Sequence, residues 1–66
     1  MGKKVRCKRD FGYFEKGKIY YVQRMVTIHE CGVVDSVWDI FFGEEPIGGA
    51  RNILGSDLQD FFEVIQ

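Results

Sequence analysis

Hydrophobic and polar residues alternate near the start of the chain, from Lys3 to Lys8, where Val5 and Cys7 fall on one side and basic residues on the other. A period of two residues is typical of a strand with one buried face. A second strand is predicted from about Lys18 to Val26, because it opens with β-branched and aromatic residues that favour a pleated, half-buried surface. Gly17 stands just before it, where a tight turn needs a positive φ.

The rest of the chain contains the patterns of three more strands and one helical turn. Residues 27–32 are consistent with a continuation of the second strand into a glycine turn. Ser56 and Gln59 have the spacing of a capping box, which predicts a short helix starting there. Residues 43–49 contain one proline and three glycines and are predicted to form a loop. The further strands are predicted from Val33 or Val34 to Phe42, from Ala50 to Leu54 and from Phe62 to Ile65.

The phase of these strands predicts which side chains form the core. On the third strand Asp39 distinguishes the two faces, because a face that carries a carboxylate is more often the wet one. Trp38 is then buried, and Val37 and Phe41 point outward. The predicted core consists of Val5, Cys7, Tyr20, Val22, Trp38, Ile40, Phe42, Leu58, Phe62 and Val64.

The composition indicates one small packed domain over residues 1–66, since 45% of the residues are hydrophobic and the aromatic residues are six Phe, three Tyr and one Trp. A chain of this size buries only about 60% of its unfolded surface, so we expect no large pocket. The longest apolar run is far shorter than the roughly 20 residues that a bilayer span requires. We therefore expect a soluble chain that does not bind membranes.

The net charge of −1 hides an asymmetry between two parts of the chain. Residues 1–24 carry eight basic and two acidic side chains, a net charge of +6, whereas residues 25–66 carry one basic and eight acidic side chains, a net charge of −7. The asymmetry fits a nucleic-acid-binding face opposite an acidic face. The simpler interpretation is that the two parts interleave in one barrel, where basic and acidic strands lie side by side as cross-strand pairs.

The residues that could carry chemistry form no recognisable catalytic or metal-binding pattern. Cys7, His29 and Cys31 suit zinc, but a fourth ligand and a CxxC spacing are absent from the sequence. His29 has no nucleophile motif, and the glycines lack the phosphate-binding fingerprint. We therefore expect no enzymatic activity, no cofactor and no metal. Two cysteines without a paired spacing and no secretory leader predict a reduced, cytoplasmic protein.

Several short segments of this chain occur in the order of a known pattern. They are Arg6-Cys7 at the end of the first strand, the run from Phe14 to Val22 with its Lys-Gly-Lys turn, Asp39 with Gly43, and Phe62-Glu63-Val64 at the end. In this order they resemble the small SH3-like barrel proteins encoded by tailed bacteriophages, and the match covers nearly the whole chain. The resemblance implies a mainly β, small SH3-like barrel of about five strands with one short helical turn before the last strand. The sequence departs from the pattern by having Ile40-Phe41-Phe42 inside the expected polar turn and a longer glycine-rich segment after it.

The resemblance also implies a function. Phage proteins of this size and fold often bind a host protein to inhibit it, redirect it or block a defence system, and some are sensed by such systems. We therefore expect a monomer that binds a host or bacterial defence protein in the cytoplasm of the bacterial host. Large apolar side chains that fall out of phase with the core, or in a loop before the second strand, mark the predicted surface. The predicted partner-binding residues are Phe11, Tyr13, Tyr21, Val37 and Phe41.

Two alternatives stay open at the level of the sequence. Phe11 and Phe41 could instead cover a second small core. The chain could also be a nucleic-acid-binding or ribosome-associated module, in which Lys4, Arg6 and Lys8 form a basic row on the first strand, near aromatic residues that stack with bases. The pI of about 5.7 is opposite to the usual basic character of such modules.

Overall fold

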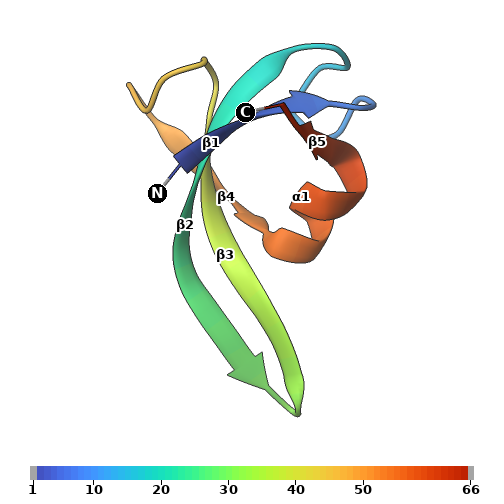
Figure 1. The fold of residues 1–66 in the computed structure, drawn as a ribbon, viewed down its shortest axis with the longest axis vertical. Helices are drawn as coiled ribbons and strands as arrows, with labels where there is room; N and C mark the ends of the chain where they lie inside the picture. Colours follow the sequence, from blue (N-terminus) through green and yellow to red (C-terminus); the bar gives the residue numbers. More distant parts are fainter. Residues whose placement is uncertain (1, 66) are drawn as a thin grey trace.

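The computed structural model describes residues 2–65, which form one antiparallel sheet of five strands and one short helix (Figure 1). The strands follow the order β4-β3-β2-β1-β5 across the sheet. The mainly β class, with a helical turn before the last strand, is confirmed. The elements are β1 (Gly2–Cys7), β2 (Ile19–Glu30), β3 (Val33–Phe41), β4 (Ala50–Leu54), α1 (Gly55–Phe61) and β5 (Phe62–Val64).

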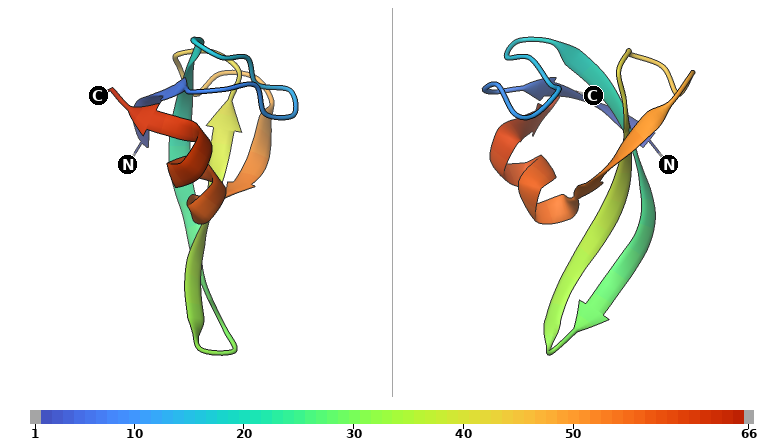
Figure 2. Two further views of the ribbon diagram at one scale, coloured as in Figure 1. Left: turned by 90° about the vertical axis from the view of Figure 1, so that its right-hand side faces the viewer. Right: turned by 180° about the vertical axis from the view of Figure 1, so that it is seen from behind.

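The sheet is open, with β4 and β5 at its two edges. Among the described strands β5 pairs with β1 alone, and β4 pairs with β3 alone. α1 connects these two edges and covers one face of the curved sheet (Figure 2). The sheet is therefore not closed into the expected barrel, and α1 lies between the two edge strands in the chain.

The core lies between the sheet and α1. The buried hydrophobic side chains of residues 2–65 are Val5, Cys7, Phe14, Tyr20, Val22, Ile40, Ile53, Leu58 and Phe62. Most of them were predicted from the phase of the strands, which confirms the period of two on β1 and β2. Trp38 is half-buried and packs against this cluster.

Two of the predicted core residues are exposed instead. Phe42 is 47% exposed because β3 ends one residue before it, and its ring stacks on Phe14 with the centroids 5.4 Å apart. Val64 is 60% exposed because it lies on the edge strand β5. Phe14 from the loop and Ile53 from β4 take their places in the core.

The loop between β1 and β2, residues 8–18, folds over the core and is anchored there by Phe14. The Phe14 ring packs edge-on against Tyr20, with the centroids 5.2 Å apart. Gly17 adopts a φ of +88°, as the predicted turn requires, and its N–H donates to the carbonyl of Cys7 at 2.8 Å. The predicted tight turn before the second strand is confirmed.

The start of α1 differs from the predicted capping box. Leu54 is the N-cap residue and makes no side-chain cap hydrogen bond, and Ser56 lies within the first turn. Asp35 of β3 supplies the acceptor instead, since its Oδ1 accepts a hydrogen bond from the Ser56 N–H at 3.2 Å. Gly55 permits this approach, because a Cβ there would clash with the side chain of Ser36. Within residues 2–65 no helix has the length and hydrophobicity that a bilayer crossing requires.

Candidate protein-interaction surface

β2 and β3 extend beyond the rest of the sheet as a two-stranded arm, which we define as residues 24–36 (Figures 1 and 2). β1 pairs with β2 only as far as Gln23, and β4 pairs with β3 only from Val37 onward. Between these limits the two strands pair only with each other among the described strands. The arm therefore projects from the domain with two open edges.

A two-residue turn closes the arm. Cys31 and Gly32 have φ values of +50° and +78°, and positive φ at both central positions is the geometry of a tight hairpin whose twist matches its strands. A β-bulge between Arg24 and Val26 lies at the base of the arm and locally increases the strand twist. The continuation of the second strand into a turn at Gly32 is thus confirmed.

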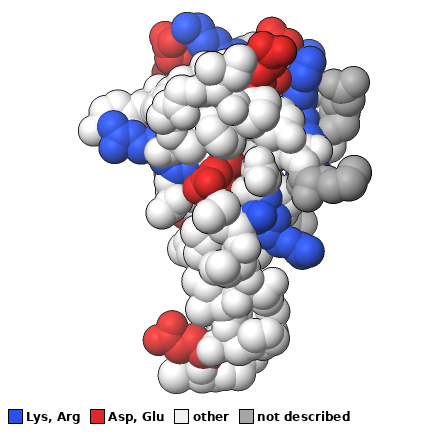
Figure 3. Space-filling view, turned by 90° about the vertical axis from the view of Figure 1, so that its left-hand side faces the viewer, with Lys and Arg blue, Asp and Glu red and all other residues white. Residues whose placement is uncertain are grey.

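Large apolar side chains of the arm are exposed to solvent. Their exposed fractions lie between 54% and 65%, and Glu30 is the single Asp, Glu, Lys or Arg of residues 25–34. Figure 3 shows the arm as a largely uncharged surface with acidic atoms near its tip. Contiguous exposed apolar surface commonly marks a binding site. The residues are Met25, Val26, Val33 and Val34.

The face of the sheet opposite α1, which we call the outer face, adjoins the arm. Residues directly opposite one another on antiparallel strands point to the same face. Val37 lies opposite Val26 of β2 and Leu54 of β4, and both neighbours are exposed. Phe41 lies opposite Tyr21, with the ring centroids 6.0 Å apart. Three of the predicted partner-binding residues, namely Tyr21, Val37 and Phe41, therefore share the outer face.

The other two predicted partner-binding residues lie on the core side, in the loop over α1. The Phe11 ring stacks on Phe61 of α1 with the centroids 4.2 Å apart, and Phe11 is half-buried against the core. Tyr13 is 71% exposed, and the guanidinium of Arg51 lies 4.7 Å from the centre of its ring. This loop therefore does not lie beside the outward-facing residues of β2 and β3. Phe11 thus packs against the main core cluster and not in the second small core of the alternative interpretation.

A groove of about 880 Å³ separates the arm from α1. Trp38, Leu58 and Phe62 line its base, and Val33 and Val34 of the arm line one wall. The expectation of no large pocket, which was based on the small size of the core, is wrong. The groove takes no volume from the core. It arises where the arm projects past the helix.

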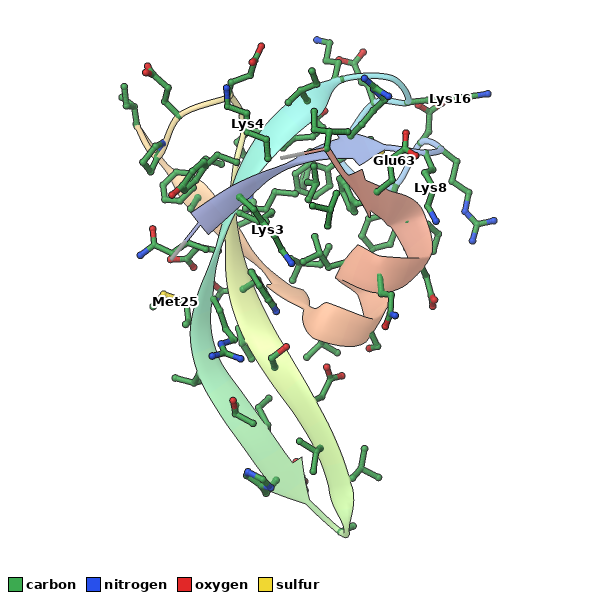
Figure 4. All side chains as sticks on the ribbon, in the orientation of Figure 1. Lys3, Lys4, Lys8, Lys16, Met25 and Glu63 are labelled. Carbon is green, nitrogen blue, oxygen red and sulfur yellow. The ribbon has the colours of Figure 1, made fainter. Side chains whose placement is uncertain are left out.

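Two basic side chains border the groove beside Trp38. The Nζ of Lys3 lies 4.8 Å from the centre of the Trp38 ring, and Arg24 lies opposite Trp38 in the pairing of β2 with β3. In Figure 4 the Lys3 side chain runs from β1 into the space between the sheet and α1. The ion pairs found among residues 2–65 involve neither Lys3 nor Arg24.

Asp35 lies at the arm's contact with α1. Its Oδ1 accepts hydrogen bonds from the N–H of Ser36 at 2.7 Å and from the N–H of Ser56 at 3.2 Å, and its Oδ2 accepts one from the Ser56 hydroxyl at 2.9 Å. These donors, the Ser36 N–H first, hold the pKa of Asp35 below its ordinary value. The carboxylate is therefore ionised at neutral pH, and its hydrogen bonds with Ser56 connect the arm to α1.

The basic row predicted as a nucleic-acid site is largely paired with carboxylates. The Nζ of Lys4 lies 3.6 Å from Glu44, and a guanidinium nitrogen of Arg6 lies 3.3 Å from Glu63. Arg6 and Glu63 are direct partners in the pairing of β1 with β5. Lys8 lies beyond the end of β1. At Arg6 and Glu63, a basic residue from the first part of the chain and an acidic residue from the second part thus form a cross-strand pair.

Cys7 lies far from His29 and Cys31 in the fold. Cys7 is 1% exposed, its Sγ donates to the Arg9 carbonyl at 2.8 Å, and burial raises the pKa of its thiol. His29 and Cys31 lie at the end of the arm. Among residues 2–65 no three His, Cys, Asp or Glu side chains are arranged to hold a metal ion.

Comparisons of the chain with protein-family models, with curated proteins and with solved structures returned no match.

The arm is not among the surfaces predicted from the sequence. The signal is present in Glu30-Cys31-Gly32-Val33, where two residues that include a glycine separate two strand-forming segments. Such a short turn keeps both strands paired up to their ends. Because β1 has only six residues, the paired strands must extend beyond it.

Proposed function

We propose that this chain is a small, non-enzymatic SH3-like protein of the phage type that binds a host protein through the arm and the outer face. The chain would inhibit or redirect that protein, act as a counter-defence factor, or be sensed by a defence system. The SH3-like assignment is supported by the strand order, in which the first strand lies between the second and the fifth and a helix precedes the fifth. The segments that resemble phage proteins agree with it.

The observation that carries the proposal is the exposure of the arm. Open strand edges and exposed apolar side chains promote unwanted association, and small proteins usually protect them. Here Val33 and Val34 are more than 60% exposed at the end of a projecting hairpin. A partner that covers the arm removes this liability. The Tyr21 and Phe41 rings on the outer face add aromatic side chains of the kind enriched in interface cores.

The nucleic-acid alternative has weaker support. Lys4 and Arg6 have carboxylate partners, which lowers the positive charge that a phosphate backbone would meet. Residues 25–34 of the arm, by contrast, carry one charged side chain, Glu30. An apolar surface suits a protein partner better than a polyanion.

Affinity purification tests the proposal. The tagged chain is used to capture partners from a bacterial lysate with and without nuclease, and any captured protein is then purified and recombined with the chain. A host protein that is retained after nuclease and binds directly is the expected result. Loss of all captured material on nuclease treatment contradicts the proposal and favours the nucleic-acid alternative.

Two variants locate the binding surface. Replacement of Tyr21 and Phe41 by Ser should weaken capture of the host protein while a cooperative thermal transition remains. Replacement of Lys4, Arg6 and Lys8 by Glu should leave capture unchanged. Collapse of the thermal transition in the first variant would show that the two rings are structural, and loss of capture in the second would assign binding to the basic row, with the steep salt dependence of nucleic-acid binding.

A further inference from the structure

We propose that the groove between the arm and α1 binds an extended peptide segment in which an acidic residue adjoins a large apolar one. The inference rests on the proposed function in that the ligand is a protein, but it concerns the side of the arm opposite the outer face. A volume of about 880 Å³ lies within the range of small ligand sites and can hold a few side chains.

Trp38 gives the groove an apolar seat in a fixed orientation. The ring is half-buried against the core, and its indole N–H donates to the Oγ of Ser36 at 2.8 Å. Leu58 and Phe62 lie at the base and Val34 lies on the wall. An apolar side chain of a ligand placed there would be shielded from water on several sides. Anchors of this kind supply most of the binding energy in interfaces.

The free charge at the groove is positive. Lys3 and Arg24 line the groove, and the carboxylates of residues 2–65 form no ion pair with either of them. Asp35 is the single acidic residue of the lining, and its oxygens already accept hydrogen bonds from Ser36 and Ser56. A carboxylate of the ligand would therefore meet two cations beside the Trp38 seat, which gives complementarity of charge.

The wall of the groove favours an extended backbone. β4 pairs with β3 only from Val37, so residues 33–36, which line the groove, have an open strand edge. Extended peptides add to such edges through backbone hydrogen bonds, and adjacent pockets select their side chains. The Ser36 N–H already donates to Asp35 and is therefore not available to a ligand.

The position of Lys3 favours a peptide over a nucleic acid. Its ammonium lies over the face of the Trp38 ring at 4.8 Å from the centre. A base would need that face for stacking and would have to displace the ammonium. A carboxylate can bind the Lys3 ammonium without displacing it from the Trp38 ring.

A displayed peptide library tests the groove. Random dodecapeptides on the surface of yeast are selected on the immobilised wild-type chain, and the recovered peptides are titrated against two variants of equal charge change. The first variant, Lys3→Glu with Arg24→Glu, reverses the charge of the groove. The matched control, Lys8→Glu with Lys16→Glu, changes two lysines outside the lining, both labelled in Figure 4.

Recovered peptides should contain Asp or Glu beside Leu, Phe or another large apolar residue. They should bind the groove variant about tenfold more weakly, a loss of about 1.4 kcal/mol, and the control variant as tightly as the wild type. Binding should also change the emission of Trp38, which is the only tryptophan of the chain. Recovery of no peptides, of peptides without acidic residues, or of peptides that bind the groove variant equally well would overturn the inference.

Two controls keep the outcomes separate. If the Glu variant does not show a cooperative thermal transition, Lys3→Gln with Arg24→Gln replaces it. An oligomer of dT is titrated in parallel, and its binding with a change in Trp38 emission, in the absence of peptide binding, would assign the groove to nucleic acid and overturn the inference. The proposed function fails if no host protein is retained after nuclease. The groove inference fails alone if a host protein is retained but the recovered peptides bind the wild type and the groove variant equally.

Discussion

Asp35 on β3 and Ser56 in α1 are joined by two hydrogen bonds, one from the Ser56 N–H and one from the Ser56 hydroxyl, both to the Asp35 carboxylate. Asp35 belongs to the arm and Ser56 to the helix, so the pair ties together the two elements that border the groove. It also replaces the local side-chain cap that α1 lacks. The width of the groove and the start of the helix therefore depend on one carboxylate.

The stability that Asp35 supplies should depend on pH. Its pKa is lowered in the folded chain by donors from Ser36 and Ser56, so its contribution is fully present above the pKa of an unfolded aspartate and is lost as the pH falls through the lower folded value. Asp35→Asn should therefore lower the Tm at neutral pH. The difference in Tm between wild type and variant should stay constant down to about pH 4 and narrow below it. A constant difference down to pH 2 would contradict this account.

Gly55 should not tolerate a side chain. A Cβ at this position would clash with Ser36 and would approach Asp35 and Trp38 within 3.3 Å, so the helix start would have to move away from β3. We expect Gly55→Ala to cost about 1–3 kcal/mol of unfolding free energy, although alanine normally favours a helix. Gly43→Ala is the control, because a Cβ there meets no atom within 4 Å. Equal stability of the two variants in urea titrations would refute the close approach.

Cys31 occupies a backbone conformation that suits other residues better. Its φ of +50° lies in the left-handed region, which costs an ordinary residue roughly 1–2 kcal/mol and costs asparagine less. Cys31→Asn should raise the unfolding free energy by about 1 kcal/mol, or the Tm by about 4–8 °C. Cys31→Val should lower both, since a β-branched side chain fits this region poorly. Thermal melts that rank valine above asparagine would show that the turn is not of this type.

Much of the fold is predictable from alternation alone. Val5, Tyr20 and Ile40 are buried as the period of two requires. Phe42 and Val64 have the right phase but lie where the sheet ends, and the phase of a strand says nothing of where its neighbours stop. Ser56 has the local signature of a cap, yet the acceptor comes from Asp35, 21 positions away in the sequence. Contacts of this range are not encoded in a short motif.

The candidate surface is predictable in part for the same reason. Tyr21, Val37 and Phe41 reach the outer face because they alternate with core residues on their own strands. Phe11 lies in a loop, where no periodicity exists, and packs on Phe61 of α1. The arm follows from the difference in length between β1 and β2, which requires the pairing of the strands rather than the pattern of one of them.

The central claim is that the arm binds the host protein, and calorimetric titration of that protein with arm variants tests it most directly. Val33→Ser with Val34→Ser removes two exposed apolar side chains and should leave the Tm nearly unchanged. Ile47→Ser is the matched control, since Ile47 is 72% exposed in the loop before β4. We predict that the arm variant binds at least about tenfold more weakly while the control keeps its affinity. Wild-type affinity in the arm variant, with an intact fold, would contradict the account.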